Sequence, residues 1–169
     1  DRRKLGDDPA LFLAAAIIKY VAASAAGRLP QYNNEPLIAE PLIGFADGRD
    51  PLFREYKKKE IIGDFHLTPE EALATYLERQ QQTAPDKPRE AVSVISVAFT
   101  PSREMCLSNP ANARMASPRW SQAYGVTFGL MSETLSYTVS LLEAAGRRAV
   151  APACTPPMSN KISQIRSAP

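Results

Sequence analysis

The first long apolar segment of the chain covers residues 10–18, with the sequence ALFLAAAII. Asp8 and Pro9 precede it, and an aspartate N-cap followed by proline at the first helical position is typical of a helix start. The helix is expected to continue to about Ala26, because Gly27 is a natural C′ residue. Apolar residues surround most of its circumference, so we expect the helix to be covered on more than one side.

Two shorter helices are predicted after an extended connection over residues 28–50. Glu-Pro pairs in that connection bias the residue before each proline away from the helical conformation. Asp50-Pro51 begins a short helix over about 51–60. A capping box with the sequence TPEE then begins a helix over about 69–82.

The clearest strand in the sequence is AVSVISVAF, residues 91–99. Both of its alternating faces are largely apolar, which is typical of a central strand covered on both sides. A long helix is predicted over about 122–145, with Ser121 as its cap and Gly146 at its end. Residues 147–151 predict a second strand, so the order of elements is βαβ-like and indicates a parallel sheet.

These elements predict a mixed α/β fold, in which a βαβ-containing sheet is flanked by helices. The chain has 169 residues, a length that suits one domain overall. Within it we expect a helical N-terminal segment with an extended loop over 1–90, and an α/β core portion with a Pro- and Ser-rich tail over 91–169. The chain starts without Met and ends at Ala168-Pro169, so the fold is expected to be an incomplete part of a longer or processed polypeptide.

The overall charge gives no sign of a nucleic-acid or membrane partner. Twenty basic and eighteen acidic residues give a net charge of +2, which indicates neither a nucleic-acid nor a membrane partner. The apolar run at 10–18 is too short to span a bilayer. These features predict a cytoplasmic protein.

No complete catalytic or metal site is predicted within the chain. Cys106 and Cys154 lie far apart without a CxxC pair, so a zinc or iron–sulfur site built from this chain alone lacks ligands. His66 is the one histidine, and no other ligand stands at a suitable spacing on its element. Neither a GxGxxG nor a GxxxxGK[ST] loop occurs, so a conventional nucleotide-binding loop is missing.

The best candidate for ligand contact is the segment RMASPRWSQAYG, residues 114–125. Arg119, Trp120 and Tyr124 lie where a long loop, residues 100–120, enters the predicted helix. A helix N-terminus has free N–H groups and a positive dipole end, so it can hold an anion or a polar ligand edge. Arginine adds a planar fork and tryptophan a stacking face. The alternative is that the tryptophan anchors the loop to the core and the arginine lies on the surface.

Four stretches of the sequence resemble the epoxyqueuosine reductase-like iron–sulfur proteins and, more distantly, the corrinoid-dependent reductive dehalogenases. They are EPLIGFADGRDPLFREYKK at 40–58, GDFHLTPEEALATYL at 63–77, VSVISVAF at 92–99, and PRWSQAYG with its long helix and AAGRRAVAP at 118–152. The resemblance implies an N-terminal α/β domain similar to nitroreductase-like folds, which in the best-known members holds cobalamin. A ferredoxin-like portion with cysteine-ligated 4Fe-4S clusters follows it in the family.

The resemblance also implies how far the family's site can be carried over. Its glycine-rich segment, acidic catalytic position and cluster cysteines would come after Pro169, and Cys106 and Cys154 match no cluster motif. The positions carried over as cofactor-binding are Arg119, Trp120 and Tyr124. The expected function is the cofactor-facing part of an oxidoreductase that is inactive alone. Its expected partner is the missing C-terminal ferredoxin-like portion or another chain.

Two other functions remain open from the sequence. A non-catalytic interaction subunit, including a homo-oligomer, would explain the all-round apolar first helix and the lack of a complete site. A flavin-binding nitroreductase-like enzyme would need a phosphate-binding cluster such as Arg114, Arg119, Lys161 and Arg166.

Overall fold

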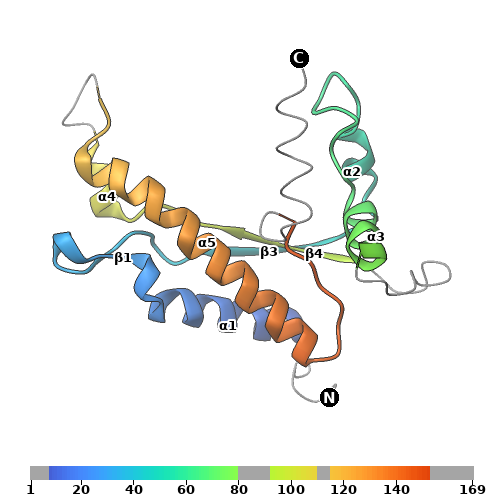
Figure 1. Cartoon of the computed structure of the whole chain (residues 1–169), viewed down its shortest axis with the longest axis horizontal. Coiled ribbons are helices and arrows are strands. Elements are labelled where there is room, and N and C mark those ends of the chain that lie inside the picture. Colours follow the sequence, from blue (N-terminus) through green and yellow to red (C-terminus); the bar gives the residue numbers. More distant parts are fainter. Residues whose placement is uncertain (1–7, 80–91, 110–114, 153–169) are drawn as a thin grey trace. The chain divides into compact units, whose positions relative to one another are not determined.

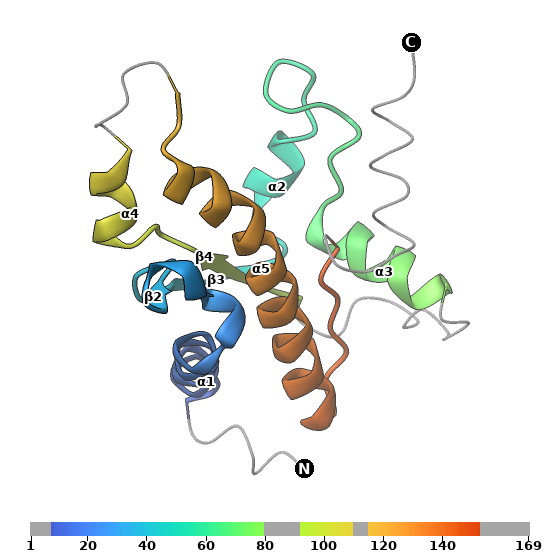
Figure 2. The same cartoon turned by 60° about the vertical axis from the view of Figure 1, so that its left-hand side comes forward.

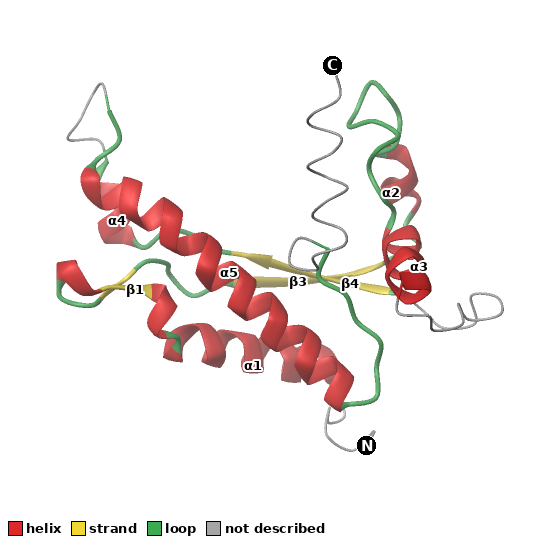
Figure 3. Cartoon of the chain, in the orientation of Figure 1, coloured by secondary structure: helices red, strands yellow, loops and turns green. Residues whose placement is uncertain are grey.

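The computed structural model describes residues 8–79, 92–109 and 115–152 of the chain (Figure 1). This part contains both helices and short strands (Figure 3). In chain order the elements are α1 (Pro9–Ala23), η2 (Ala25–Gly27), β1 (Arg28–Leu29), η3 (Pro30–Tyr32), β2 (Glu35–Pro36), β3 (Leu42–Asp47), α2 (Pro51–Glu55), α3 (Pro69–Arg79), β4 (Ser93–Ala98), α4 (Arg103–Ser108) and α5 (Pro118–Ala144).

The described residues divide into two compact units. Unit 1 comprises residues within 1–43 and 97–147, and it contains α1, β1, β2, α4 and α5. Unit 2 comprises residues within 44–96 and 148–169, and it contains α2 and α3. Strands and helices are mixed, so the predicted α/β class is confirmed at this level.

Two predicted helix starts are confirmed by their capping contacts. The carboxylate of Asp8 accepts hydrogen bonds from the N–H groups of Ala10 and Leu11, both at 3.0 Å. At α3 the capping box is complete, since Thr68 N–H donates to the Glu71 carboxylate at 2.9 Å and Glu71 N–H donates to the Thr68 hydroxyl at 3.3 Å. These short-range contacts satisfy backbone donors that a helix leaves free at its start.

Helix α5 begins one turn earlier than the sequence predicted. The cap is Ser117, whose hydroxyl accepts the Trp120 N–H at 3.1 Å, and Pro118 takes the first helical position. Ser121, the predicted cap, lies inside the helix because the Ser-Pro pair upstream offers a complete start signal. The predicted end is confirmed: Gly146 has φ +75° and follows the last turn.

The predicted parallel βαβ sheet is wrong. The described strands form two antiparallel two-stranded sheets, β1 with β2 and β3 with β4. Hydrogen bonds from Gly48 N–H to Val92 O (2.7 Å) and from Ala39 N–H to Thr100 O (2.9 Å) extend the β3–β4 pairing beyond the strand ends. Residues 147–151, the predicted second strand, have no regular secondary structure.

The partner of β4 is part of the segment predicted as an extended connection. The Glu40-Pro41 pair keeps that segment non-helical, and β3 follows it directly. A second prediction also fails here, because no residue of β4 is fully buried and the strand pairs with β3 alone among the described strands. β4 is therefore not a central strand covered on both sides.

The core of unit 1 lies between α1 and α5. One stripe of α1, made of Leu13, Ile17 and Val21, is buried, and Tyr20 stacks on Tyr137 of α5 with ring centroids 4.2 Å apart. Figure 2 shows α1 nearly end-on with α5 beside it. Buried threonines on α5 satisfy their hydroxyls within the helix, because Thr134 donates to the carbonyl of Leu130 and Thr138 to that of Thr134.

The rest of α1 is not covered as predicted. Leu11 is 69% exposed and Phe12 is 39% exposed, although both are large apolar side chains. One partner helix can cover only one stripe of an apolar helix, and α5 is that partner in unit 1. Within the described residues, no helix is both long enough and apolar enough to cross a membrane.

In unit 2, charge pairs join α3 to the region around α2. Lys57 donates to both carboxylate oxygens of Glu71 at 2.7 Å, and Arg49 and Arg54 lie 3.6 and 3.8 Å from the carboxylate of Glu70. The ammonium group of Lys57, with the Thr68 N–H, holds the pKa of Glu71 below its usual value.

Candidate functional site

The three predicted site residues lie on the first two turns of α5 in unit 1, but they face different surroundings. Arg119 turns toward the segment 28–36, which contains β1, η3 and β2. Its guanidinium lies 3.1 Å from Oε2 of Glu35 and 4.6 Å above the ring centroid of Tyr32. Arg119 therefore joins α5 to this segment and is not a free cation at the surface.

A second contact joins the same two pieces of chain. Gln31 donates from Nε2 to Oε1 of Gln122, one turn after Arg119. We call this set of five side chains the polar latch. Its members are Gln31, Tyr32, Glu35, Arg119 and Gln122. Because 119 and 122 are three residues apart on a helix, both point to one side, where the 28–36 segment lies.

The charge pair in the polar latch is partly buried. The side chains of Arg119 and Glu35 are 25% and 30% exposed. Oε2 of Glu35 is itself buried and accepts no well-aligned hydrogen bond among the described residues. The contact is therefore mainly an attraction between two charges, in surroundings that screen them less than open water does.

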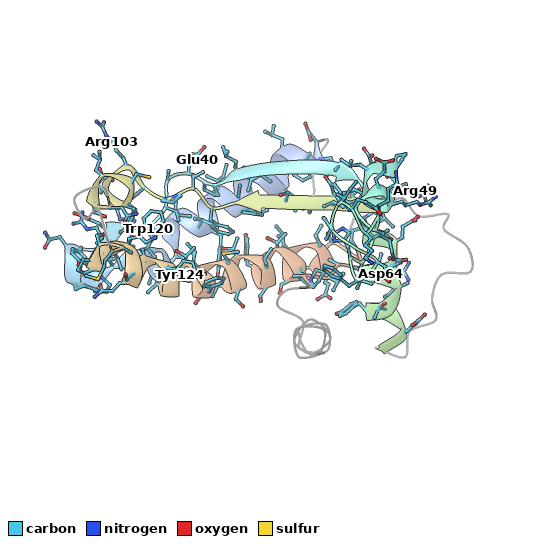
Figure 4. All side chains as sticks on the ribbon, turned by 90° about the horizontal axis from the view of Figure 1, so that it is seen from above. Glu40, Arg49, Asp64, Arg103, Trp120 and Tyr124 are labelled. Carbon is cyan, nitrogen blue, oxygen red and sulfur yellow. The ribbon has the colours of Figure 1, made fainter. Side chains whose placement is uncertain are left out.

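Trp120 and Tyr124 belong to a different feature, a row of aromatic residues along α5. Trp120 is half-buried, while Tyr124 is 65% exposed (Figure 4). Tyr124 meets Phe128 edge to face, with ring centroids 5.2 Å apart, and Phe128 is 55% exposed. These three residues, Trp120, Tyr124 and Phe128, are called the aromatic row below.

The sequence prediction missed two parts of this region. Phe128 could have been found, because residues 120, 124 and 128 repeat at four-residue spacing and so lie along one side of a helix. Glu35 and Tyr32 had no such signal, since no local pattern relates them to Arg119. Their pairing with it depends on how the 28–36 segment folds back on α5.

The N-terminus of α5 is occupied by side chains of the protein. Ser117 is buried, caps the Trp120 N–H, and lies with its hydroxyl 3.1 Å from that of Ser108. Its own N–H donates to the side chain of Asn109 at 3.1 Å. An anion at this position would therefore have to compete with the Ser117 side chain for the Trp120 N–H.

The described residues do not fit a metal or iron–sulfur centre. No group of three or more His, Cys, Asp or Glu side chains is placed to hold a metal ion in the ranges that the structure describes. Cys106 is exposed on α4, and Cys154 lies outside the described residues. His66 is half-buried and meets the ring of Tyr56 edge to face at 5.7 Å, which is a packing contact.

A hollow of about 230 Å³ lies elsewhere in unit 1, between the end of α1 and the segment 36–41. Pockets for cofactors or drug-sized ligands are usually larger, roughly 300–1,000 Å³. This hollow by itself is smaller than such a pocket. Of the phosphate-binding cluster predicted for a flavin, Arg114, Lys161 and Arg166 lie outside the described residues, and Arg119 is paired with Glu35.

Comparison with known proteins adds no relative. No protein-family model matches the chain, and neither a curated protein nor a solved structure matches it.

Proposed function

We propose that this chain is a non-catalytic docking module, which presents the aromatic row of α5 to another polypeptide. The observation that carries this proposal is the exposure of Tyr124 and Phe128, two large rings already in edge-to-face contact. Aromatic residues are enriched in the buried centres of protein–protein interfaces and often supply much of the binding energy.

The charge pattern of α5 supports the same function. Over 27 residues the helix carries three charged side chains, Arg119, Glu133 and Glu143. Arg119 pairs with Glu35, and Glu133 accepts a hydrogen bond from Ser24 at 3.3 Å. A long surface helix usually carries more charges on its outer face, and the centre of an interface is depleted of them.

We further propose that the module belongs to an iron–sulfur reductase resembling epoxyqueuosine reductase and is inactive alone. The support is the ordered set of four sequence stretches, the last of which contains Trp120 and Tyr124. In this proposal a ferredoxin-like portion or chain brings the clusters and covers the aromatic row, and cobalamin, where one is used, is bound on the α/β side. Arg119 would position the row through the polar latch. A nitroreductase-like, cobalamin-domain-like fold is part of this proposal.

Site-specific cross-linking tests the docking function. A photoreactive amino acid at position 124 should capture one defined polypeptide in producing cells, and Phe128→Ser should abolish the capture. The same amino acid at exposed position 140, on the opposite side of α5, should capture none. Equal capture from both positions would contradict a specific docking face.

The identity of the captured polypeptide tests the reductase proposal separately. A cysteine-rich, ferredoxin-like sequence is expected, either in another chain or in the reading frame downstream of Pro169. Anaerobic purification together with that sequence should give a brown iron–sulfur absorbance. A captured partner without cysteines would refute the reductase proposal and leave the docking function standing.

A further inference from the structure

A second apolar stripe runs along the outer side of α1. Its members, which we call the outer stripe, are Leu11, Ala15, Ile18 and Ala22. Leu11 is 69% exposed, the two alanines are exposed, and Ile18 is half-buried. Lys19 is the one charged residue within Pro9–Ala23, and its position on the helix is to one side of the outer stripe. The stripe is therefore apolar, free of charge and open to solvent.

The spacing and the side-chain sizes of the outer stripe are self-complementary, so that two copies of the stripe can pack against each other. Its members are separated by four, three and four residues, so the spacing is the same in both directions along the helix. Large and small side chains alternate in the order Leu, Ala, Ile, Ala. In an antiparallel pair of identical stripes, Leu11 faces Ala22 and Ala15 faces Ile18, so every large side chain meets a small one. Facing positions that alternate in size can interdigitate without voids or clashes.

We propose that α1 pairs in antiparallel orientation with α1 of a second copy of this chain, through the outer stripe. A two-fold axis near the middle of the helix makes all contacts occur twice, as in other isologous interfaces. A parallel pair would instead place Leu11 against Leu11 and Ala15 against Ala15. The two leucines would then clash, and the two alanines would leave a gap between the helices. The size pattern thus selects both the partner and its direction.

The hollow beside Ala22 offers room for the Leu11 side chain of the second copy. Ile18, Val21 and Ala22 line it from α1, and Pro36, Ile38 and Pro41 line it from the other side. Arg28 and Glu40 also line it, so it combines an apolar surface with charged groups (Glu40 is labelled in Figure 4). Its volume of about 230 Å³ is small for a cofactor but sufficient for one aliphatic side chain.

The size of the contact predicts a weak dimer. A helix of 15 residues is about 22 Å long, and one stripe of it buries less than the roughly 800 Å² per partner of a standard interface. The dimer is therefore expected to dissociate on dilution. It uses α1 and not the aromatic row, so its failure would leave the docking function of α5 untouched.

Sedimentation equilibrium of the whole chain over a wide concentration range tests the association. Leu11→Glu should weaken dimerisation at least about tenfold, because each dimer loses two buried leucines. The matched control is Phe12→Glu, which introduces the same charge at an exposed apolar position beside the stripe. A monomer at every concentration, or equal losses for both variants, would overturn the proposal. Circular dichroism shows whether each variant keeps its helices.

Cysteine cross-linking tests the register and needs no destabilising charge. In a background with Cys106→Ser and Cys154→Ser, the double variant Leu11→Cys with Ala22→Cys should form a disulfide-linked dimer under mild oxidation. Leu11→Cys alone should link far more slowly, since the two copies of position 11 are about 16 Å apart along an antiparallel pair. Equally fast linking of the single variant would overturn the antiparallel register.

Discussion

The polar latch gives the sharpest quantitative prediction about this fold. Replacing Arg119 by alanine removes the charge pair with Glu35 and the cation–π contact with Tyr32 in one step. It also leaves the buried Oε2 of Glu35 without its one close cation. The variant should therefore lose more stability than an ordinary surface substitution.

The magnitude follows from the geometry of the two contacts. A partly buried ion pair at 3.1 Å contributes about 1 kcal/mol. A guanidinium 4.6 Å from a tyrosine ring adds about 0.5–1 kcal/mol. A carboxylate oxygen left buried without a partner adds about 1 kcal/mol to the loss. The free energy of unfolding should thus fall by about 2.5–3 kcal/mol in Arg119→Ala.

Urea unfolding monitored by circular dichroism measures this loss, and a double-mutant cycle with Glu35→Ala isolates the charge pair. The coupling energy of the cycle should be about 1 kcal/mol and should decrease as salt is added. Arg103→Ala is the matched control, because Arg103 is exposed on α4 and projects into solvent (Figure 4). Its effect should stay within about 0.5 kcal/mol.

Two results would refute this reasoning about the latch. A coupling energy near zero would show that Arg119 and Glu35 do not interact in solution. A loss in Arg119→Lys that equals the loss in Arg119→Ala would show that the positive charge is irrelevant. Lysine keeps the charge but lacks the planar fork, so it should restore part of the stability.

Three further predictions concern other elements. Glu71→Gln should destabilise unit 2 at neutral pH, because the lowered pKa of Glu71 in the folded state stabilises the fold above the ordinary glutamate pKa. This stability is lost as pH falls through the folded-state pKa, so the difference in stability between the variant and wild type should vanish at acid pH. A difference in urea midpoint that stays constant down to acid pH would contradict this. Gly146→Ala should lower the stability of the fold by about 1 kcal/mol, because φ is +75° at that position. Gly125→Ala should raise the stability, because Gly125 lies inside α5 with open space around it. Thermal unfolding of the two variants checks the sign of each effect. Leu130→Ala should cost about 2–5 kcal/mol, measured by urea unfolding, because its side chain is fully buried against Gly27; a loss below 1 kcal/mol would argue against this core.

Local signals in the sequence determined where α1, α2 and α3 begin and where α5 ends, whereas α4 (Arg103–Ser108) lies in a segment predicted as loop. Asp8-Pro9, the capping box before α3 and Gly146 act through hydrogen bonds within a few residues, so they can be recognised without the rest of the fold. The error at α5 was of the same kind, because Ser117-Pro118 is also a local signal. The exposed aromatic row was likewise present in the spacing of residues 120, 124 and 128.

Strand pairing and the partners of the site residues were decided only by the tertiary structure. The apolar sequence of β4 indicates a strand but carries no information about which extended segment pairs with it. Arg119 was recognisable as a helix-start arginine, yet the 28–36 segment determines that it meets Glu35 and Tyr32. The apolar circumference of α1 likewise could not show which stripe α5 covers and which stays open. Caps and turns depend on neighbours in the chain, so the sequence alone revealed them. Contacts between distant segments depend on packing, so only the tertiary structure revealed those contacts.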